Sequence, residues 1–276
     1  MKDPPPVIAA GLFPHERQRL LSLVDTLSPV QFDRETSCPG WSVKDILAHL
    51  AGDDLGAISS GRDLFAGAWY DPTDWHDLVA YINHRNETWV AAMRPLSPGV
   101  IRDLLADSGP RVHKLFASYD PLQPGPNVAW AGDGDMPMWL HVAREYTERW
   151  LHQSQVREAV GAEPLYERNV FHPVLATFVY ALPVAYRRTL APVGTHVRIA
   201  IEGDAGGLWS LVRGNGVWEL KDEVDTPAAA TVRIYQDLAW RLWTKGSDLE
   251  VERRRIRVNG DSGLAEPALH AVAIIA

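Results

Sequence analysis

The sequence is poor in cysteine, in long apolar runs and in positive charge, and each shortage excludes a class of protein. Its single cysteine, Cys38, cannot form an intrachain disulfide, which excludes a small secreted scaffold held together by disulfides. No apolar run approaches the ~18 residues that suggest a membrane helix, and residues 1–15 lack the apolar core of a signal peptide. We therefore expect a cytoplasmic protein with no membrane partner.

Basic residues are outnumbered, because 27 Lys and Arg face 35 Asp and Glu and give a net charge of −8. An acidic chain gains little from the phosphates of nucleic acid or from an anionic lipid surface, so we expect neither as a partner. The 276 residues, 46% of them apolar, are enough for one large or two ordinary domains, and we expect two.

The first half of the chain has helical periodicity. Apolar residues recur at intervals of three and four in residues 15–27, 77–94 and 99–118. Gly109-Pro110 predicts an interruption of the third of these helices. Residues 119–136 are rich in Pro and Gly and predict a long loop, of a length that is commonly functional.

A turn and a capping signal begin the helix that carries His49. Pro39-Gly40 predicts the turn, and Ser42 followed by Asp45 is typical of a capping box at a helix N-terminus. His49 lies at the margin of the packed face of this helix. A single histidine there is more commonly a hydrogen-bonded core residue than a metal ligand, so this segment alone does not predict a site.

Residues 141–161, HVAREYTERWLHQSQVREAVG, predict a helix with one polar stripe. At about 100° per residue, His141, Glu145, Glu148 and His152 fall within roughly a quarter of its circumference. For this segment alone a solvated face, with Glu148 and His152 as a surface pair, is the favoured interpretation. The alternative is a metal site, since a carboxylate and an imidazole one turn apart can share an ion with a third ligand from another helix.

The pattern changes after Gly161. Residues 168–188 predict helix, divided into two pieces by Pro173 and Pro183. Strands are predicted at 197–201, 208–213, 217–220, 231–235 and 256–258, and helices at 238–243 and 264–275. These elements predict a small antiparallel sheet covered by helices, whose core we expect to contain Trp209, Trp218, Trp240 and Trp243.

Two distant segments carry a family resemblance. They are Cys38-Pro-Gly-Trp-Ser-Val-Lys-Asp-Ile-Leu-Ala-His49-Leu50 and Glu148-Arg-Trp-Leu-His152. Together they resemble the DinB-like, mycothiol-dependent maleylpyruvate isomerase family, and Ile256-Arg-Val-Asn-Gly-Asp261 resembles part of that family's second domain. The resemblance spans nearly the whole chain, and the two segments in combination are more specific than either alone.

The resemblance implies an α + α/β two-domain fold. Residues 1–165 would form a DinB-like four-helix bundle, and residues 166–276 a smaller α+β domain with an antiparallel sheet, similar to sterol-carrier folds. The bundle would bind a divalent metal, usually zinc in the family, although nickel suits the same nitrogen and oxygen donors. By motif the ligands are His49, Glu148 and His152, whereas His141 and Glu145 gain no such support.

The resemblance also implies an enzyme that binds a low-molecular-weight thiol, mycothiol or bacillithiol, at the open metal position. In the isomerase the thiolate adds to an activated double bond of a small electrophile such as maleylpyruvate, rotation follows, and the thiol leaves. A transferase would keep the adduct. Neither reaction needs a nucleophile from the protein, so we expect Cys38 to be a small buried residue.

Two residues are candidates for catalytic roles. Family members with isomerase activity typically carry Asp three residues after the second ligand His, where this chain has Gln155. Arg213, and likewise Arg233, lies on a predicted strand and could offer a cation to a carboxylate substrate. The alternative to an enzyme is a non-catalytic protein that binds the metal and an apolar ligand or protein partner. Four protein ligands would favour this alternative, and three would favour the enzyme.

Overall fold

The computed structural model describes residues 1–65, 67, 70–222 and 224–274. The chain forms two compact units that are interleaved along the sequence. The helical unit contains Ile8–Pro121 and Glu145–Leu165, and the sheet unit contains Met1–Val7, Leu122–Arg144 and Tyr166–Ile274. That residues 1–165 and 166–276 are separate domains stays a prediction.

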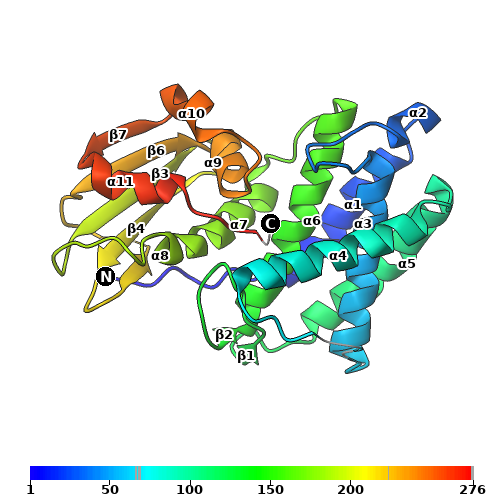
Figure 1. Cartoon of the computed structure of the whole chain (residues 1–276), viewed down its shortest axis with the longest axis horizontal. Helices are drawn as coiled ribbons and strands as arrows, with labels where there is room; N and C mark the ends of the chain where they lie inside the picture. The colour runs from blue at the N-terminus through cyan, green and yellow to red at the C-terminus, as the bar shows by residue number, and fades with distance from the viewer. Residues whose placement is uncertain (66, 68–69, 223, 275–276) are drawn as a thin grey trace. The chain divides into compact units, whose positions relative to one another are not determined.

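The helical unit is built around α3. Its elements are η1 (Ala10–Leu12), α1 (Phe13–Val24), α2 (Pro29–Phe32), α3 (Val43–Ala57), η2 (the π-helix Ile58–Arg62), α4 (Trp75–Met93), α5 (Pro98–Ala117) and most of α6 (Met138–Val160). In Figure 1, α3 packs against α4 and α5, and α1 packs against α5. Their apolar faces form one core, which includes Leu20, Val43, Ile46, Leu47, Leu50, Met93, Ile101, Leu105 and Val156.

The start of α3 follows from its local sequence. Gly40 has φ +80°, a backbone conformation that favours glycine, and it completes the turn into the helix. Ser42 Oγ accepts a hydrogen bond from the Asp45 amide, and the Asp45 carboxylate accepts one from the Ser42 amide. The predicted capping box is therefore confirmed, and it fixes where α3 begins and which residues face the core.

Proline was a poor guide to the ends of two helices. The predicted interruption at Gly109-Pro110 is wrong, because α5 continues through Pro110 to Ala117. Pro173 likewise lies inside α7 (Arg168–Phe178). Both helices bury their apolar faces, and this packing outweighs the one backbone hydrogen bond that each proline removes.

The predicted loop 119–136 contains a short pairing. β1 (Pro124–Gly125) pairs with β2 (Met136–Pro137) in an antiparallel arrangement. The second strand leads directly into α6.

Besides the short β1–β2 pair, the described residues of the sheet unit form a five-stranded sheet in the order β5-β4-β3-β6-β7. The strands are β3 (His196–Glu202), β4 (Gly207–Arg213), β5 (Trp218–Lys221), β6 (Ala230–Tyr235) and β7 (Arg257–Gly260). The prediction of an antiparallel sheet holds for three pairs of neighbours, but β3 and β6 run parallel. The β4–β5 hairpin lies between them in the sequence, so the chain crosses over and enters β6 in the same direction as β3.

Helices cover one face of this sheet. They include α8 (Leu182–Ala185), α9 (Gln236–Trp243) and α11 (Ser262–Leu269), each of which contacts strands, while α7 packs on α9. The unit also contains η3 (Val179–Ala181), α10 (Leu249–Glu252) and η4 (Arg253–Arg255). In Figure 1, α9 and α11 pack against β3 and β6. Trp209, Trp218, Trp240 and Trp243 are all buried, as predicted.

The end of the chain departs from the prediction of a helix over 264–275. Among the described residues the helix α11 spans Ser262–Leu269, and Ile275 lies outside them. Asp261 caps this helix by accepting hydrogen bonds from the amides of Gly263 and Leu264. In the described part of the chain, no helix combines the length and the apolar character that crossing a membrane requires.

Candidate metal centre

Three side chains from two helices converge in the helical unit. His49 projects from α3, and Glu148 and His152 project from α6. Glu148 Oε1 lies 3.7 Å from His49 Nε2 and 3.2 Å from His152 Nε2. One ligand atom from each residue lies within 4.8 Å of the others, which is close enough for one ion to contact all three. That these residues are metal ligands stays a prediction.

Gln155 holds the ring of His152 in place. The Oε1 atom of Gln155 lies 2.8 Å from His152 Nδ1 and can accept a hydrogen bond from the Nδ1–H group. In that tautomer the Nε2 atom carries a lone pair and faces Glu148. Two imidazole nitrogens and one carboxylate oxygen, with one ring oriented by a hydrogen bond, fit the donor set of a divalent zinc-type ion.

A second carboxylate contacts His49, although it lies outside the group of three, and the sequence prediction missed it. Asp53 Oδ2 lies 3.2 Å from His49 Nε2, on the nitrogen that also faces Glu148. The spacing of four residues on α3 puts Asp53 on the same face as His49, one turn further along. That spacing, His-x-x-x-Asp, was the available signal in the sequence.

The charges of these groups depend on one another. Burial acts to raise the pKa of Glu148, but hydrogen bonds and charge from His152 and His49 outweigh it, so the pKa lies well below its usual range. Burial acts to lower the pKa of His49, but the charges of Asp53 and Glu148 outweigh it, so the pKa is raised. The cluster therefore favours positive charge at its centre, which a proton or a metal cation can supply.

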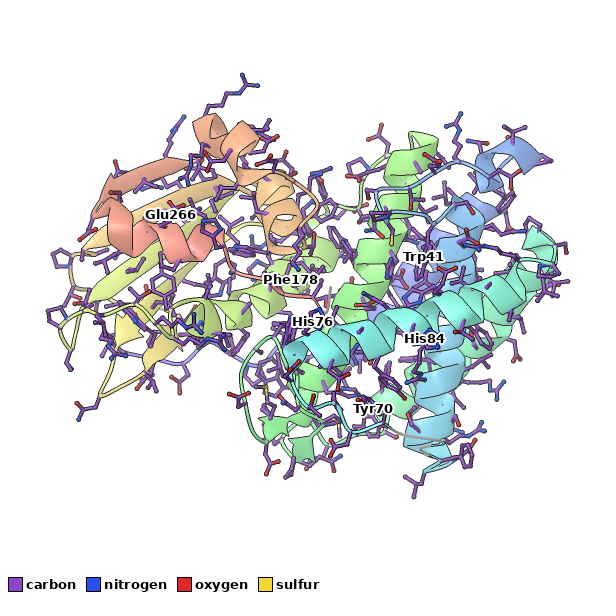
Figure 2. The ribbon with its side chains drawn as sticks, in the orientation of Figure 1. Trp41, Tyr70, His76, His84, Phe178 and Glu266 are labelled. Carbon is purple, nitrogen blue, oxygen red and sulfur yellow. The ribbon has the colours of Figure 1, made fainter. Side chains whose placement is uncertain are left out.

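Trp41 forms one wall of the cluster. Its ring centroid lies 4.9 Å from that of His49 and 6.3 Å from that of His152. Its indole Nε1 donates a hydrogen bond to Glu87 (3.1 Å), which fixes the ring at the N-terminal end of α3, where Figure 2 labels it. Trp41 thus shields the histidines as well as packing on the core.

Cys38 is half-buried near the turn before α3. Burial, and secondly the charge of Glu148, raise the pKa of the Cys38 thiol to about 11. The thiol therefore stays protonated at neutral pH, as expected for a residue that is not a nucleophile.

A buried ion-pair network adjoins the cluster of His49, Glu148 and His152. Asp54, next to Asp53 on α3, accepts hydrogen bonds from Arg149 (2.9 Å) and from Ser108 of α5 (2.6 Å). Arg17 of α1 contacts the same carboxylate at 2.8 Å. Because Arg149 adjoins Glu148 on α6, this network ties the two helices that carry the candidate ligands.

The other predicted residues do not join the cluster. Glu145 accepts a hydrogen bond from Arg149 at 2.8 Å and is buried in that pair. His141 belongs to the part of α6 that is in the sheet unit. Arg213 is the last residue of β4, and Arg233 lies on β6, so both are in the sheet unit and their roles stay predictions.

Comparisons with known proteins identify the family. The family model for the mycothiol maleylpyruvate isomerase N-terminal domain matches residues 13–157. Uncharacterized proteins of Mycobacterium tuberculosis, strains CDC 1551 / Oshkosh and ATCC 25618 / H37Rv, are 26% identical over 219 residues, which is 76% of this chain and 78% of each relative.

Solved structures show the same fold. The crystal structure of the mycothiol-dependent maleylpyruvate isomerase has a TM-score of 0.54 at 14% identity, covering 88% of this chain and 89% of that chain. A mutant of it matches with a TM-score of 0.54 at 13% identity, covering 87% and 88%. The two-part fold of helices and a sheet is therefore shared with that isomerase. Since the family model spans more than half of the sequence, the chain belongs to the mycothiol maleylpyruvate isomerase N-terminal domain family.

Proposed function

We propose that this protein is a metal-dependent enzyme that uses mycothiol or a related thiol such as bacillithiol on a small electrophile such as maleylpyruvate. The observation that carries the proposal is the convergence of His49, Glu148 and His152 in a chain of this family. Two imidazoles and one carboxylate leave a position open on a tetrahedral ion, as in catalytic zinc sites. Zinc is the proposed metal, and nickel suits the same donors.

Each residue of the cluster has a task in this proposal. His49 and His152 would offer the lone pairs of their Nε2 atoms to the ion, and Gln155 keeps His152 in the tautomer that allows this. Glu148 offsets part of the charge of the cation, and Trp41 shields one side from water. When bound, the divalent ion would stabilise the thiolate form of the cofactor, which is the nucleophilic form.

Gln155 bears on which reaction follows thiol addition. Its amide is neutral, and its oxygen is directed at His152 Nδ1, so the carboxylate typical of isomerases in the family is missing at this position. This favours thiol transfer, in which the adduct is kept, over cis-trans isomerisation, in which the thiol leaves again.

A thiol screen tests the proposal. Zinc-loaded protein is incubated with mycothiol, bacillithiol or glutathione and a panel of electrophiles that includes maleylpyruvate. Adduct formation or isomerisation above the rate without protein, and its loss in His49→Ala, is the expected result. No turnover with any thiol at full zinc occupancy would contradict it.

The proposal extends to the fold and location. α1, α3, α5 and α6 are proposed to form a DinB-like four-helix bundle, which the shared core and ion-pair network of these helices support. The sheet unit is proposed to be sterol-carrier-like. A cytoplasmic location is proposed because the thiol must stay reduced.

Asp53 favours a second candidate, a non-catalytic metal-binding protein. Its carboxylate lies 3.2 Å from His49 Nε2 and could complete four protein ligands, which would close the position that a thiol needs. Cobalt-substituted protein separates the two candidates. If the cobalt absorption spectrum responds to added thiol in the natural chain, the position is open; if it responds only in Asp53→Asn, Asp53 occupies it.

A further inference from the structure

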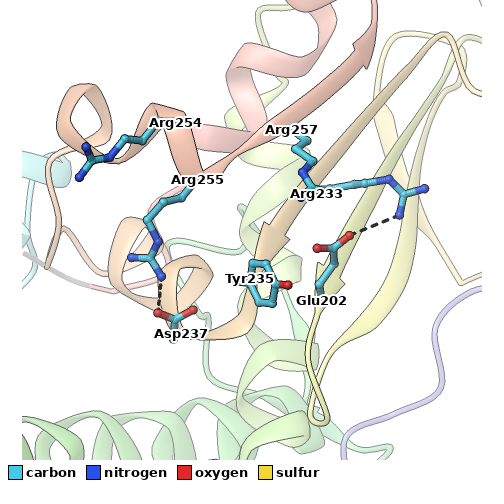
Figure 3. A pocket seen from close by; sticks show the side chains of 7 residues that line it. All are labelled: Glu202, Arg233, Tyr235, Asp237, Arg254, Arg255 and Arg257. Atoms are coloured by element: carbon cyan, nitrogen blue, oxygen red, sulfur yellow. Dashed lines mark hydrogen bonds and ion pairs between the residues drawn. The ribbon is translucent and has the colours of Figure 1, made fainter.

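Arginines gather near strands β6 and β7 of the sheet, and only some of them are paired with carboxylates. Arg233 and Tyr235 on β6 are exposed, and Arg257 on β7 is exposed as well. With Glu202, Asp237, Arg254 and Arg255 they line a pocket of about 360 Å³, which we call the arginine pocket (Figure 3). All seven residues belong to the sheet unit.

The strand register places two positive charges opposite each other. Arg233 is the direct partner of Arg257 in the antiparallel pair β6–β7. Like charges in this position repel and destabilise a sheet. The carboxylate that Arg233 contacts is Glu202, at 3.6 Å, and Figure 3 shows this contact directed away from Asp237. Arg233 is therefore paired with a carboxylate, whereas Arg257 has no carboxylate partner among the described residues.

Neighbouring arginines in the same run are neutralised. Arg253 pairs with Glu250 and Glu266, and Arg255 pairs with Asp237 and Glu252. By contrast, Arg254 and Arg257 make no ion pair with any residue that the structure describes. Of the four arginines that line the pocket, Arg233 and Arg255 therefore have carboxylate partners, and Arg254 and Arg257 have none among the described residues.

We propose that the arginine pocket binds a compact anion with two negative charges, a dicarboxylate or a phosphate ester. Four arginines and two carboxylates line the pocket, so its lining has an excess of two positive charges. Planar guanidinium forks match the oxygens of carboxylate and phosphate, and the Tyr235 hydroxyl adds a neutral donor. The volume suits a small metabolite. The pocket goes beyond the proposed thiol chemistry and does not require the metal.

Binding is measured by calorimetry and thermal shift on the full chain, treated with EDTA, at low ionic strength. The probes are inorganic phosphate and malonate, which separate the two sources of the charge. We expect one of them to bind in the millimolar range or tighter, with Kd raised about tenfold in Arg257→Thr and in Arg233→Thr. Arg253→Gln is the matched control, since it lies in the same run but is already paired, and it should bind as the natural chain does.

A double-mutant cycle on Arg233 and Arg257 measures the coupling free energy between the two residues, which would be near zero for two exposed arginines that neither face each other nor share an anion. Without the anion, the two positive charges should repel each other. Removing one arginine from the natural chain should therefore stabilise the protein more than removing it from a chain that already lacks the other arginine. With saturating anion the coupling should change sign.

Three outcomes would overturn the proposal. The first is no binding of either probe, and the second is an equal loss of binding in Arg253→Gln, which would indicate unspecific charge attraction. The third is tighter binding of duplex DNA than of either small anion, which would indicate a surface for a polyanion.

Discussion

At the scale of single residues, the candidate metal centre makes a sharp prediction about which side chains matter. We expect His49→Ala, Glu148→Ala and His152→Ala each to lose far more zinc than His141→Ala, because the three residues converge and His141 does not join them. Elemental analysis after dialysis at fixed free zinc measures this. Full metal in His49→Ala, together with loss in His141→Ala, would mean that the ligands come from α6 alone.

Gln155 gives a second prediction. We expect Gln155→Leu to weaken zinc binding by ~10–100-fold, because it removes the acceptor 2.8 Å from His152 Nδ1. Gln155→Asp should keep the metal and raise any isomerisation of maleylpyruvate, since a carboxylate can orient the ring and also take a proton. Zinc content and isomerisation rate are measured together. An unchanged rate in Gln155→Asp with intact metal would contradict the second part.

How far these residues could be predicted depends on sequence distance. Glu148 and His152 share a helix, so their spacing alone brings them onto one face, and the same holds for His49 and Asp53. Periodicity could not predict that α3 lies against α6, because that contact is set by packing between helices far apart in the sequence. Only the family resemblance joined His49 to the other two.

At the scale of helices, the buried network should fix how α3 meets α6. Asp54 is fully buried and contacts both Arg149 and Arg17. We expect Asp54→Asn to cost ~3–5 kcal/mol of stability, because it leaves buried arginines without their counter-charge, and also to weaken zinc binding. Urea denaturation measures the first effect.

The matched control is an exposed ion pair. Arg111 and Asp107 form a pair on α5 with side chains 42% and 71% exposed. We expect Asp107→Asn to change stability by less than ~1 kcal/mol and to leave zinc binding unchanged. Equal costs at Asp54 and Asp107 would show that the network does not hold the helices.

The elements themselves were predictable where local physics decides them. Apolar periodicity indicated the helices and strands, and the Ser42 capping box placed the start of α3. The predictions that failed concern features that depend on contacts between residues far apart in the sequence. Pro110 and Pro173 remain inside helices because of tertiary packing, and the parallel β3–β6 pair arises from a crossover past a hairpin.

At the scale of the whole molecule, net charge does not indicate where local charge gathers. A total of −8 describes the long-range field, but it says nothing about the local run of positive charge at Arg253–Arg255 and Arg257. The arginine pocket depends on which of these charges find partners, and that is settled by α10, α11 and β6 together.

The free energy of unfolding of the whole chain should depend on pH because of one buried acid. Glu16 on α1 is 1% exposed, and neither of its carboxylate oxygens has a hydrogen-bond partner among the described residues. Burial raises its pKa from 4.5 to about 7, although Arg17 and Arg149 act in the opposite direction. Between these two values the folded protein holds a proton that the unfolded chain has released. Stability from this group is therefore highest below pH 4.5, falls as the pH rises to about 7, and is constant above that.

We expect Glu16→Gln to abolish this pH dependence. At about 1.4 kcal/mol per pKa unit, the shift corresponds to roughly 3 kcal/mol, so the variant should exceed the natural chain by up to that amount near pH ~8 and match it only near pH ~3.5, below the unfolded-state pKa. Urea denaturation of both proteins across this range measures the difference, and Asp103→Asn, whose side chain is 79% exposed, is the control that should follow the natural chain throughout. A difference that stays constant with pH, or that grows toward acid, would mean that the Glu16 carboxylate is charged and compensated inside the fold, with its oxygens satisfied by bound water.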